Sequence, residues 1–290
     1  MKRASWRPAA AVVILTATIA AFIYYFATHP AVRQQLQQVR PLTLAIILLL
    51  YFGTVGALAM INIGTLKLCK IRMSGSESLL LTSYSAIVNF FGPLQSGPAF
   101  RAVYLKKKHG LKLRNYTAAT FMYYFFYGAF SGLFLLSGLL KWWLAILAGA
   151  GIVAALVMRR ERWVGSRLAG LNMGGWYYLA LATFLQVSAV ALIYYTELRS
   201  VAPGTHFSQA IIYTGAANLA LFVSLTPGAI GFRESFLLFS QRLHHVSSSA
   251  IVAANIIDRA MYIVLLLIMA LFIFGTHARR QLQVPKVDTD

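Results

Sequence analysis

Charged residues are unusually few in this chain of 290 residues: they make up 11% of it, against 59% hydrophobic residues. A water-soluble domain carries about 25% charged residues, because its surface must face water. The apolar residues also gather in runs close to the ~20 residues that cross a bilayer core as a helix. These proportions exclude a soluble domain and predict an all-α integral membrane protein.

Acidic residues are scarcer still, since 7 Asp and Glu stand against 26 Lys and Arg, for a net charge of +19. A basic surplus of this size can indicate nucleic-acid binding. Here, however, the basic residues lie in short loops between apolar runs, which is the positive-inside signature of a membrane protein. We therefore expect membrane lipids and no nucleic acid as partners.

A single cysteine, Cys69, excludes an intramolecular disulfide. The 6 histidines show no ligand spacing, and the sequence contains no nucleotide-binding motif and no nucleophile–base–acid set. We accordingly expect no metal and no cofactor, and a transporter-like protein rather than an enzyme.

Apolar runs of membrane-spanning length predict about six full transmembrane helices, at residues 8–28, 42–64, 116–139, 142–158, 176–196 and 250–275. Two further apolar segments are interrupted by Gly92–Pro98 and by Thr226–Gly228. Proline lacks an N–H group and clashes with the preceding turn, so each segment should stop and restart. The interruptions predict two broken or re-entrant helical hairpins, near residues 79–104 and 207–242.

The basic residues also orient the chain. If the N-terminus is inside and each hairpin returns to its starting side, the inside loops collect most of the 26 Lys and Arg. This bias predicts that both termini are cytoplasmic. The two hairpins then open to opposite faces, which predicts an inverted repeat. We expect residues 1–275 to form a single polytopic membrane domain, followed by a short basic and polar tail over residues 276–290.

The densest polar signal lies in the second hairpin. Thr226 is a natural N-cap, and with Gly228 and Gly231 it would aim unpaired N–H groups of the restarted helix into the protein, an arrangement that binds anions. Arg233 and Glu234 follow at once. In one interpretation Arg233 binds an anionic headgroup, and Glu234 orients it or relays a proton. In the other, the two form a structural ion pair that neutralises itself between helices.

The first hairpin offers a comparable site, because Arg101 follows the restart at Gly97–Pro98. Asn89 in this hairpin roughly echoes Asn218 in the second. The cluster Lys106–Lys108 is interpreted as a topology determinant that contacts anionic lipid.

Two charged neighbours, Asp258 and Arg259, interrupt the last span. Adjacent residues on a helix diverge by about 100°, so these two should not pair with one another. Arg259 is a further candidate for the polar site. Asp258 is, beside Glu234, a candidate for proton coupling.

These motifs resemble those of a known family. The Thr-Pro-Gly-Ala-Ile-Gly-Phe-Arg-Glu core of residues 226–234 resembles the Pro-Gly-Gly-hydrophobic-Gly-x-Arg-Glu signature of the lysylphosphatidylglycerol synthase transmembrane, flippase-like family. Residues 89–105 resemble its N-terminal motif, and Arg259 matches an arginine expected in its last span. Ala229 stands where a second glycine is usual, and residues 118–124 lack an expected Glu-Arg pair. The second departure predicts an altered or asymmetric first-half site.

The resemblance implies lipid-headgroup handling in a prokaryotic plasma membrane. Family members flip anionic or aminoacylated phospholipids, or act on polyprenyl- or hopanoid-type lipids. In the full-length synthases a separate soluble domain transfers the amino acid from aminoacyl-tRNA. Only a short tail follows Gly275 here, so aminoacyl transfer by this chain alone is disfavoured.

We therefore expect a flippase or lipid-binding protein of the inner cell membrane that holds a phosphate-bearing headgroup between the two hairpins. One alternative is a membrane-embedded transferase, or its accessory subunit, in envelope lipid or glycan biosynthesis, with Glu234 as its acid or base. Another is a scaffold for envelope-lipid biosynthetic enzymes, in which the polar residues are only structural.

Overall fold

The computed structural model describes residues 30–91, 96–138, 174–223 and 232–275, and all the regular structure in these ranges is helical. The helices are α2 (Pro30–Gln37), α3 (Pro41–Leu68), α4 (Gly75–Phe91), α5 (Ser96–His109), α6 (Leu113–Leu136), α8 (Gly174–Val201), α9 (Phe207–Val223), α10 (Phe232–Phe239), α11 (Gln241–His244) and α12 (Ser248–Gly275). The spans expected at residues 8–28 and 142–158, and the tail at 276–290, lie outside these ranges.

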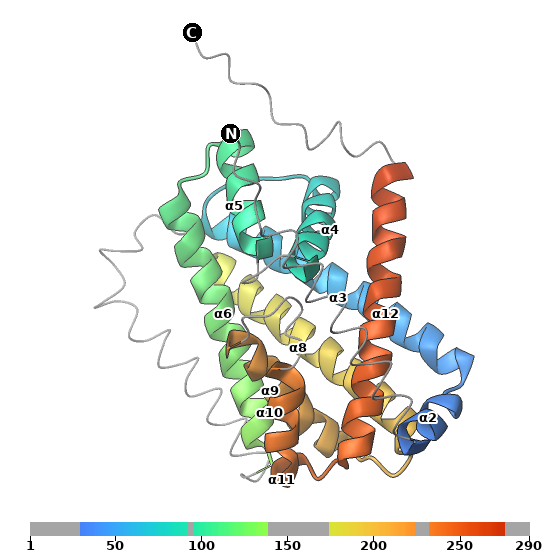
Figure 1. The fold of residues 1–290 in the computed structure, drawn as a ribbon. Helices are drawn as coiled ribbons and strands as arrows, with labels where there is room; N and C mark the ends of the chain where they lie inside the picture. Colours follow the sequence, from blue (N-terminus) through green and yellow to red (C-terminus); the bar gives the residue numbers. More distant parts are fainter. Residues whose placement is uncertain (1–29, 92–95, 139–173, 224–231, 276–290) are drawn as a thin grey trace, which may run out of the picture.

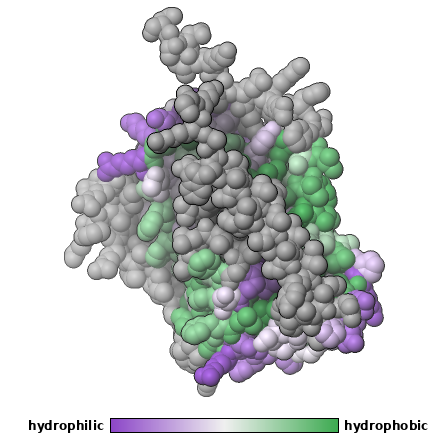
Figure 2. Space-filling model, viewed as in Figure 1, coloured by the Kyte–Doolittle hydropathy of each residue, from purple (hydrophilic) through white to green (hydrophobic). Residues whose placement is uncertain are grey.

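Four of the expected spans are confirmed as helices that are long and apolar enough to cross a membrane, namely α3, α6, α8 and α12. Large apolar side chains point outward from them: Leu49 is 70% exposed, Phe121 71% and Leu271 72%. Figure 2 shows apolar residues along the flank formed by α12, with hydrophilic residues gathered toward the upper and lower ends of the molecule. Such an apolar surface suits lipid rather than water.

Helices α3 and α8 pack along one another across the middle of the molecule. Helices α6 and α12 flank this pair and run in opposite directions (Figure 1). Helix α8 is longer than the sequence predicted, because it continues to Val201 rather than ending at residue 196. This correction brings a further acidic residue, Glu197, inside the helix.

The first predicted hairpin consists of α4 and α5, which pack against each other. Asn89 links the two helices, because its Oδ1 accepts a hydrogen bond from the Gly97 N–H at 3.2 Å. A Cβ atom at position 97 would lie 2.8 Å from the carbonyl oxygen of Ser85, so the return of the chain requires glycine here.

The second predicted hairpin begins with α9, which is followed by α10 packed against it. In Figure 1 this pair lies at the end of the molecule opposite to α4 and α5. The turn itself, with Thr226, Gly228 and Gly231, lies outside the described residues. Helix α9 approaches α6 closely at Gly215, where a Cβ atom would lie 2.6 Å from the carbonyl oxygen of Ser131. Small residues allow such close approach of helices in membranes.

Candidate functional site

A cavity of about 290 Å³ lies where the two hairpins meet the long helices. Its lining includes residues of both halves of the chain, from α3, α4, α5 and α6 as well as from α8, α9, α10 and α12. The structure therefore brings together most of the described candidate residues, which are Asn89, Arg101, Asn218, Arg233, Asp258 and Arg259.

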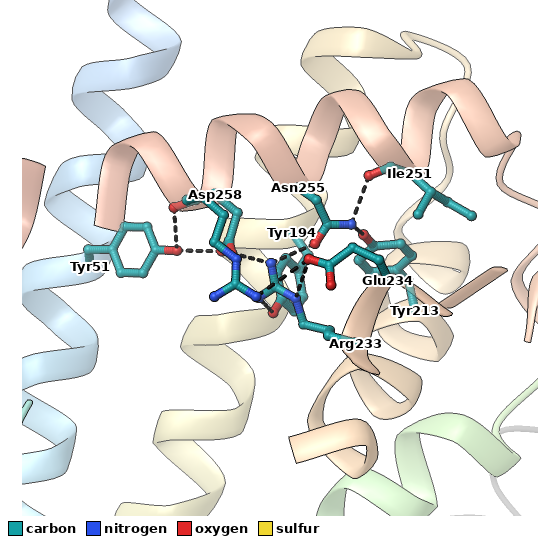
Figure 3. Close-up of polar contacts among 9 residues, drawn as sticks. Tyr51, Tyr194, Tyr213, Arg233, Glu234, Ile251, Asn255 and Asp258 are labelled. Atoms are coloured by element: carbon teal, nitrogen blue, oxygen red, sulfur yellow. Dashed lines mark hydrogen bonds and ion pairs between the residues drawn. The ribbon is translucent and has the colours of Figure 1, made fainter. Parts of the chain in front are cut away.

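One side of the cavity is formed by the second half of the chain, from α8, α9, α10 and α12. This second-half side is organised around Arg233, which is only 6% exposed. Its Nη2 donates to Asp258 Oδ2 and to Asn255 Oδ1, both at 2.5 Å, and its Nη1 donates to the Tyr194 hydroxyl at 3.1 Å. Figure 3 shows the guanidinium of Arg233 facing these side chains. Asn255 and Asp258 are three residues apart on α12 and share a face of that helix. They can therefore hold one guanidinium together.

Two further contacts extend this network across the fold. The Tyr51 hydroxyl of α3 donates to Asp258 Oδ1. Asn255 Nδ2 donates to the Tyr213 hydroxyl of α9 at 3.1 Å and to the carbonyl oxygen of Ile251 at 2.8 Å. Buried polar groups of this kind are stable only when they are hydrogen-bonded. The network thus fixes α10 and α12 relative to α3, α8 and α9.

The neighbouring charges on α10 and α12 pair across the two helices. Arg233 pairs with Asp258 at 2.5 Å, and Arg259 pairs with Glu234 at 3.4 Å. Arg233 and Glu234 are neighbours in the sequence, but Arg233 Nε and Glu234 Oε1 are farther apart, at 4.0 Å. An ion pair confined to these two residues was one of the two interpretations; they do approach each other, but each has a shorter ion pair with a residue of α12. Because two cations meet two carboxylates, this cluster is close to neutral.

The first-half side of the cavity differs, because it contains a cation without a carboxylate. Arg101 lines the cavity from α5, is half-buried and forms no ion pair within the described ranges. Beside it the Tyr123 hydroxyl of α6 donates to Gln186 Oε1 of α8 at 3.1 Å. An anion at this position would meet an uncompensated positive charge.

The unpaired buried atoms of the cavity wall share one chemical character. Four lining side chains in the described part of the chain have a buried atom without a hydrogen-bond partner, and in each case this atom belongs to an N–H donor. They are Arg101 Nε, Asn218 Nδ2, Arg233 Nε and Arg259 Nε. An unsatisfied buried donor costs about 1–3 kcal/mol. The cavity is therefore complementary to a group that only accepts hydrogen bonds, such as a phosphate or carboxylate.

Sequence reasoning missed several members of this site. The tyrosines Tyr51, Tyr194 and Tyr213 come from apolar spans, where nothing distinguishes them from interfacial or core tyrosines. Glu197 was also missed, although an acidic residue in an apolar span is itself a functional signal. It is 0% exposed, and neither of its carboxyl oxygens has a hydrogen-bond partner.

A separate polar cluster joins the two ends of the first hairpin, outside the four spans. Glu77 accepts hydrogen bonds from the Tyr104 hydroxyl at 2.5 Å, and its Oε1 lies 2.9 Å from Lys108 Nζ and from His109 Nε2. Burial alone would raise the pKa of Glu77, but the hydrogen bonds from Tyr104, Lys108 and His109 together lower that pKa below its ordinary value. Lys108 therefore has a structural partner, whereas Lys106 and Lys107 are exposed.

Most of the chain matches a known sequence family. Residues 9–270 match the sequence family described as Lysylphosphatidylglycerol synthase TM region, and this range includes both hairpins and every residue of the cavity. A comparison with curated proteins gives no match.

Proposed function

Since the chain belongs to the lysylphosphatidylglycerol synthase transmembrane family, a family of membrane proteins tied to lipid handling, we propose that it binds a lipid with a phosphate-bearing headgroup in the central cavity and moves it across the membrane. The observation that carries this proposal is the set of unpaired N–H donors on the cavity wall, of which Arg101 is the uncompensated cation. A phosphate diester offers several acceptor oxygens and no donor, so it satisfies this set.

The packing of the helices supports an inverted repeat. If α3, α4, α5 and α6 correspond in order to α8, α9, α10 and α12, each contact within or between these two groups has a counterpart. For example, α6 packs against α9 as α12 packs against α4, and α3 packs against α12 as α8 packs against α6. The opposite directions of α6 and α12 in Figure 1 agree with an inversion. Secondary transporters built in this way place their substrate between the repeats.

Individual side chains follow the same correspondence. The hydrogen bond from Tyr51 on α3 to Asp258 on α12 has a counterpart in the pair formed by Gln186 on α8 and Tyr123 on α6. Each pair joins a long central helix to a flanking helix beside the cavity. Alternate opening of these two flanks would expose the cavity first to one face of the membrane and then to the other. We propose that both termini lie on the cytoplasmic side, from the basic bias of the loops, and that the membrane is a prokaryotic inner membrane, as the family resemblance implies.

Reconstitution into lipid vesicles tests the proposal. The vesicles contain a headgroup-labelled fluorescent phosphodiester lipid, and a membrane-impermeant reductant destroys the label in the outer leaflet. We expect the wild-type protein to make the inner-leaflet label accessible, and Arg101→Met to abolish this movement. Lys107→Met is the matched control, because Lys107 is exposed and lies outside the cavity.

The outcome separates translocation from the alternatives. Equal label accessibility in wild type, Arg101→Met and protein-free vesicles would contradict translocation and favour a transferase or a scaffold. Glu234, the acid or base that a transferase would need, is engaged with Arg259 at 3.4 Å.

A further inference from the structure

Glu197 has a position that the proposed binding site does not use. It lies on α8 three residues after Tyr194, so the two side chains occupy one face of the helix. Tyr194 contacts Arg233. Glu197 is fully buried at 0% exposure, and among the residues that the structure describes neither carboxyl oxygen has a hydrogen-bond partner. It therefore lies beside the charged cluster without joining it.

The groups close enough to interact electrostatically with Glu197 come from several helices. The charged ones are Arg233 on α10 and Asp258 and Arg259 on α12. The neutral ones are the phenols Tyr51 on α3, Tyr194 on α8 and Tyr213 on α9. Both arginines already have a carboxylate partner, in Asp258 and Glu234. No cation of the cluster is left to compensate a third carboxylate.

An ionised Glu197 would thus be a buried charge without a partner. The cost of burying an isolated carboxylate is so large that such a group takes up a proton instead. The neutral carboxylic acid is the form that fits this environment. Asp258, by contrast, accepts hydrogen bonds from Arg233 and from Tyr51 and is suited to remain ionised.

We propose that Glu197 is a proton-binding residue whose protonation is coupled to occupation of the cavity by an anionic headgroup. This inference rests on the proposed function of the cavity. A bound phosphate adds one negative charge near the cluster, and an ionised Glu197 adds a second, so the two repel each other. Anion binding therefore favours the protonated Glu197. By linkage, protonation of Glu197 strengthens anion binding by the same factor.

The proton step itself is simple. When the cluster becomes accessible to water, the O–H bond of the Glu197 carboxyl breaks, the proton passes to water and a carboxylate remains near Arg233 and Arg259. The negative carboxylate then lowers the affinity of the cavity for the headgroup. Uptake of a proton from water reverses the step. Coupling of this kind would let a pH difference across the membrane bias the direction of lipid movement.

Titration of the purified full-length chain in detergent with dioctanoyl phosphatidylglycerol tests the coupling. This probe carries one phosphodiester charge that does not change over the pH range used. For the wild type we expect the dissociation constant to rise by up to about tenfold per pH unit over the range in which Glu197 ionises. Within that pH range, calorimetry in buffers of different ionisation enthalpy should show uptake of up to one proton on binding, and at lower pH, where Glu197 is already protonated, none.

Glu197→Gln, which imitates the neutral carboxyl, should bind with the low-pH affinity of the wild type at every pH and take up no proton. Glu77→Gln is the matched control, because Glu77 lies outside the cavity, and it should keep the wild-type pH dependence. An unchanged pH dependence in Glu197→Gln would overturn the coupling.

Infrared spectroscopy of the ligand-free protein separates this inference from the proposed function. A carboxylic acid band that is present in the wild type and absent in Glu197→Gln identifies the protonated side chain. If the wild type shows this band but binds no anionic lipid, the proposed function fails while the protonation of Glu197 stands. If the lipid binds but the band is missing, the inference about Glu197 fails and the proposed function stands.

Discussion

The two halves of the cavity wall are built from corresponding helices but differ in charge. In the second half Arg233 and Arg259 are each matched by a carboxylate, and Arg233 also donates hydrogen bonds to a tyrosine hydroxyl and to an asparagine side-chain oxygen. In the first half Arg101 shares the cavity wall with tyrosine, glutamine and asparagine side chains, and no carboxylate pairs with it within the described ranges.

This difference separates two roles that the sequence alone does not distinguish. A compensated arginine mainly holds helices together, because its charge is already satisfied. An uncompensated arginine is available to an external anion. We therefore propose Arg101 as the first contact of the headgroup and Arg233 as the centre of a structural network beside it.

The largest expected effect concerns the compensated half. Asp258→Ala leaves the guanidinium of Arg233, which is 6% exposed, without its carboxylate. Removing one partner of a buried pair costs about 3–5 kcal/mol, whereas replacing both by apolar residues is often neutral. Denaturant titration in detergent should show this loss for Asp258→Ala and a recovery in Arg233→Met/Asp258→Leu. Equal destabilisation of the single and double variants would show that the network is not electrostatic.

The next effect concerns the uncompensated half. Arg101→Met should lower the affinity for dioctanoyl phosphatidylglycerol about 10- to 100-fold, the loss of one hydrogen-bonded charge worth about 1.5–3 kcal/mol. It should leave the free energy of unfolding nearly unchanged. No carboxylate in the described ranges pairs with Arg101, so the substitution leaves no buried carboxylate without its partner. Binding isotherms and unfolding curves of the same preparations measure both quantities. A variant that unfolds easily but binds normally would reverse the assignment of the two roles.

A smaller effect is expected at two contacts that correspond between the halves of the cavity wall. Tyr123→Phe removes the 3.1 Å hydrogen bond to Gln186, the counterpart of the contact between Tyr51 and Asp258. A neutral hydrogen bond contributes about 0.5–1.5 kcal/mol, so the unfolding free energy should fall by that amount. If Tyr123→Phe cost as much as Asp258→Ala, the two halves would be energetically alike.

The smallest effect lies at the outer end of the first hairpin. Glu77→Gln should cost roughly 0.2–1 kcal/mol at neutral pH, as is usual for ion pairs near a surface. The pKa of folded Glu77 is lowered from its ordinary 4.5, so the stabilisation is complete above about that pH. It is lost as the pH falls through the lower pKa of the folded state. Unfolding midpoints of wild type and variant should therefore converge in acid. A difference that stays constant with pH would show that the stabilisation does not come from the ionised Glu77 carboxylate.

The sequence predicted the spans that depend on apolar run length, and it predicted the break after Phe91 from glycine and proline. It also predicted that Asp258 and Arg259 would not pair with each other, because helical geometry separates neighbours. Partners such as Tyr51 and Asn255 could not be found in this way, since tertiary packing alone brings α3, α10 and α12 together. Glu197 was missed because the predicted span ended one residue before it.

The central claim is that a phosphate group occupies the cavity against Arg101. A cryo-electron microscopy map of the protein saturated with phosphatidylglycerol tests it most directly. We expect headgroup density within hydrogen-bond distance of the Arg101 guanidinium and of Asn218 Nδ2, and its loss in Arg101→Met. A cavity filled only by water or acyl chains, with the phosphate density confined to Lys106 and Lys107 at the surface, would contradict it.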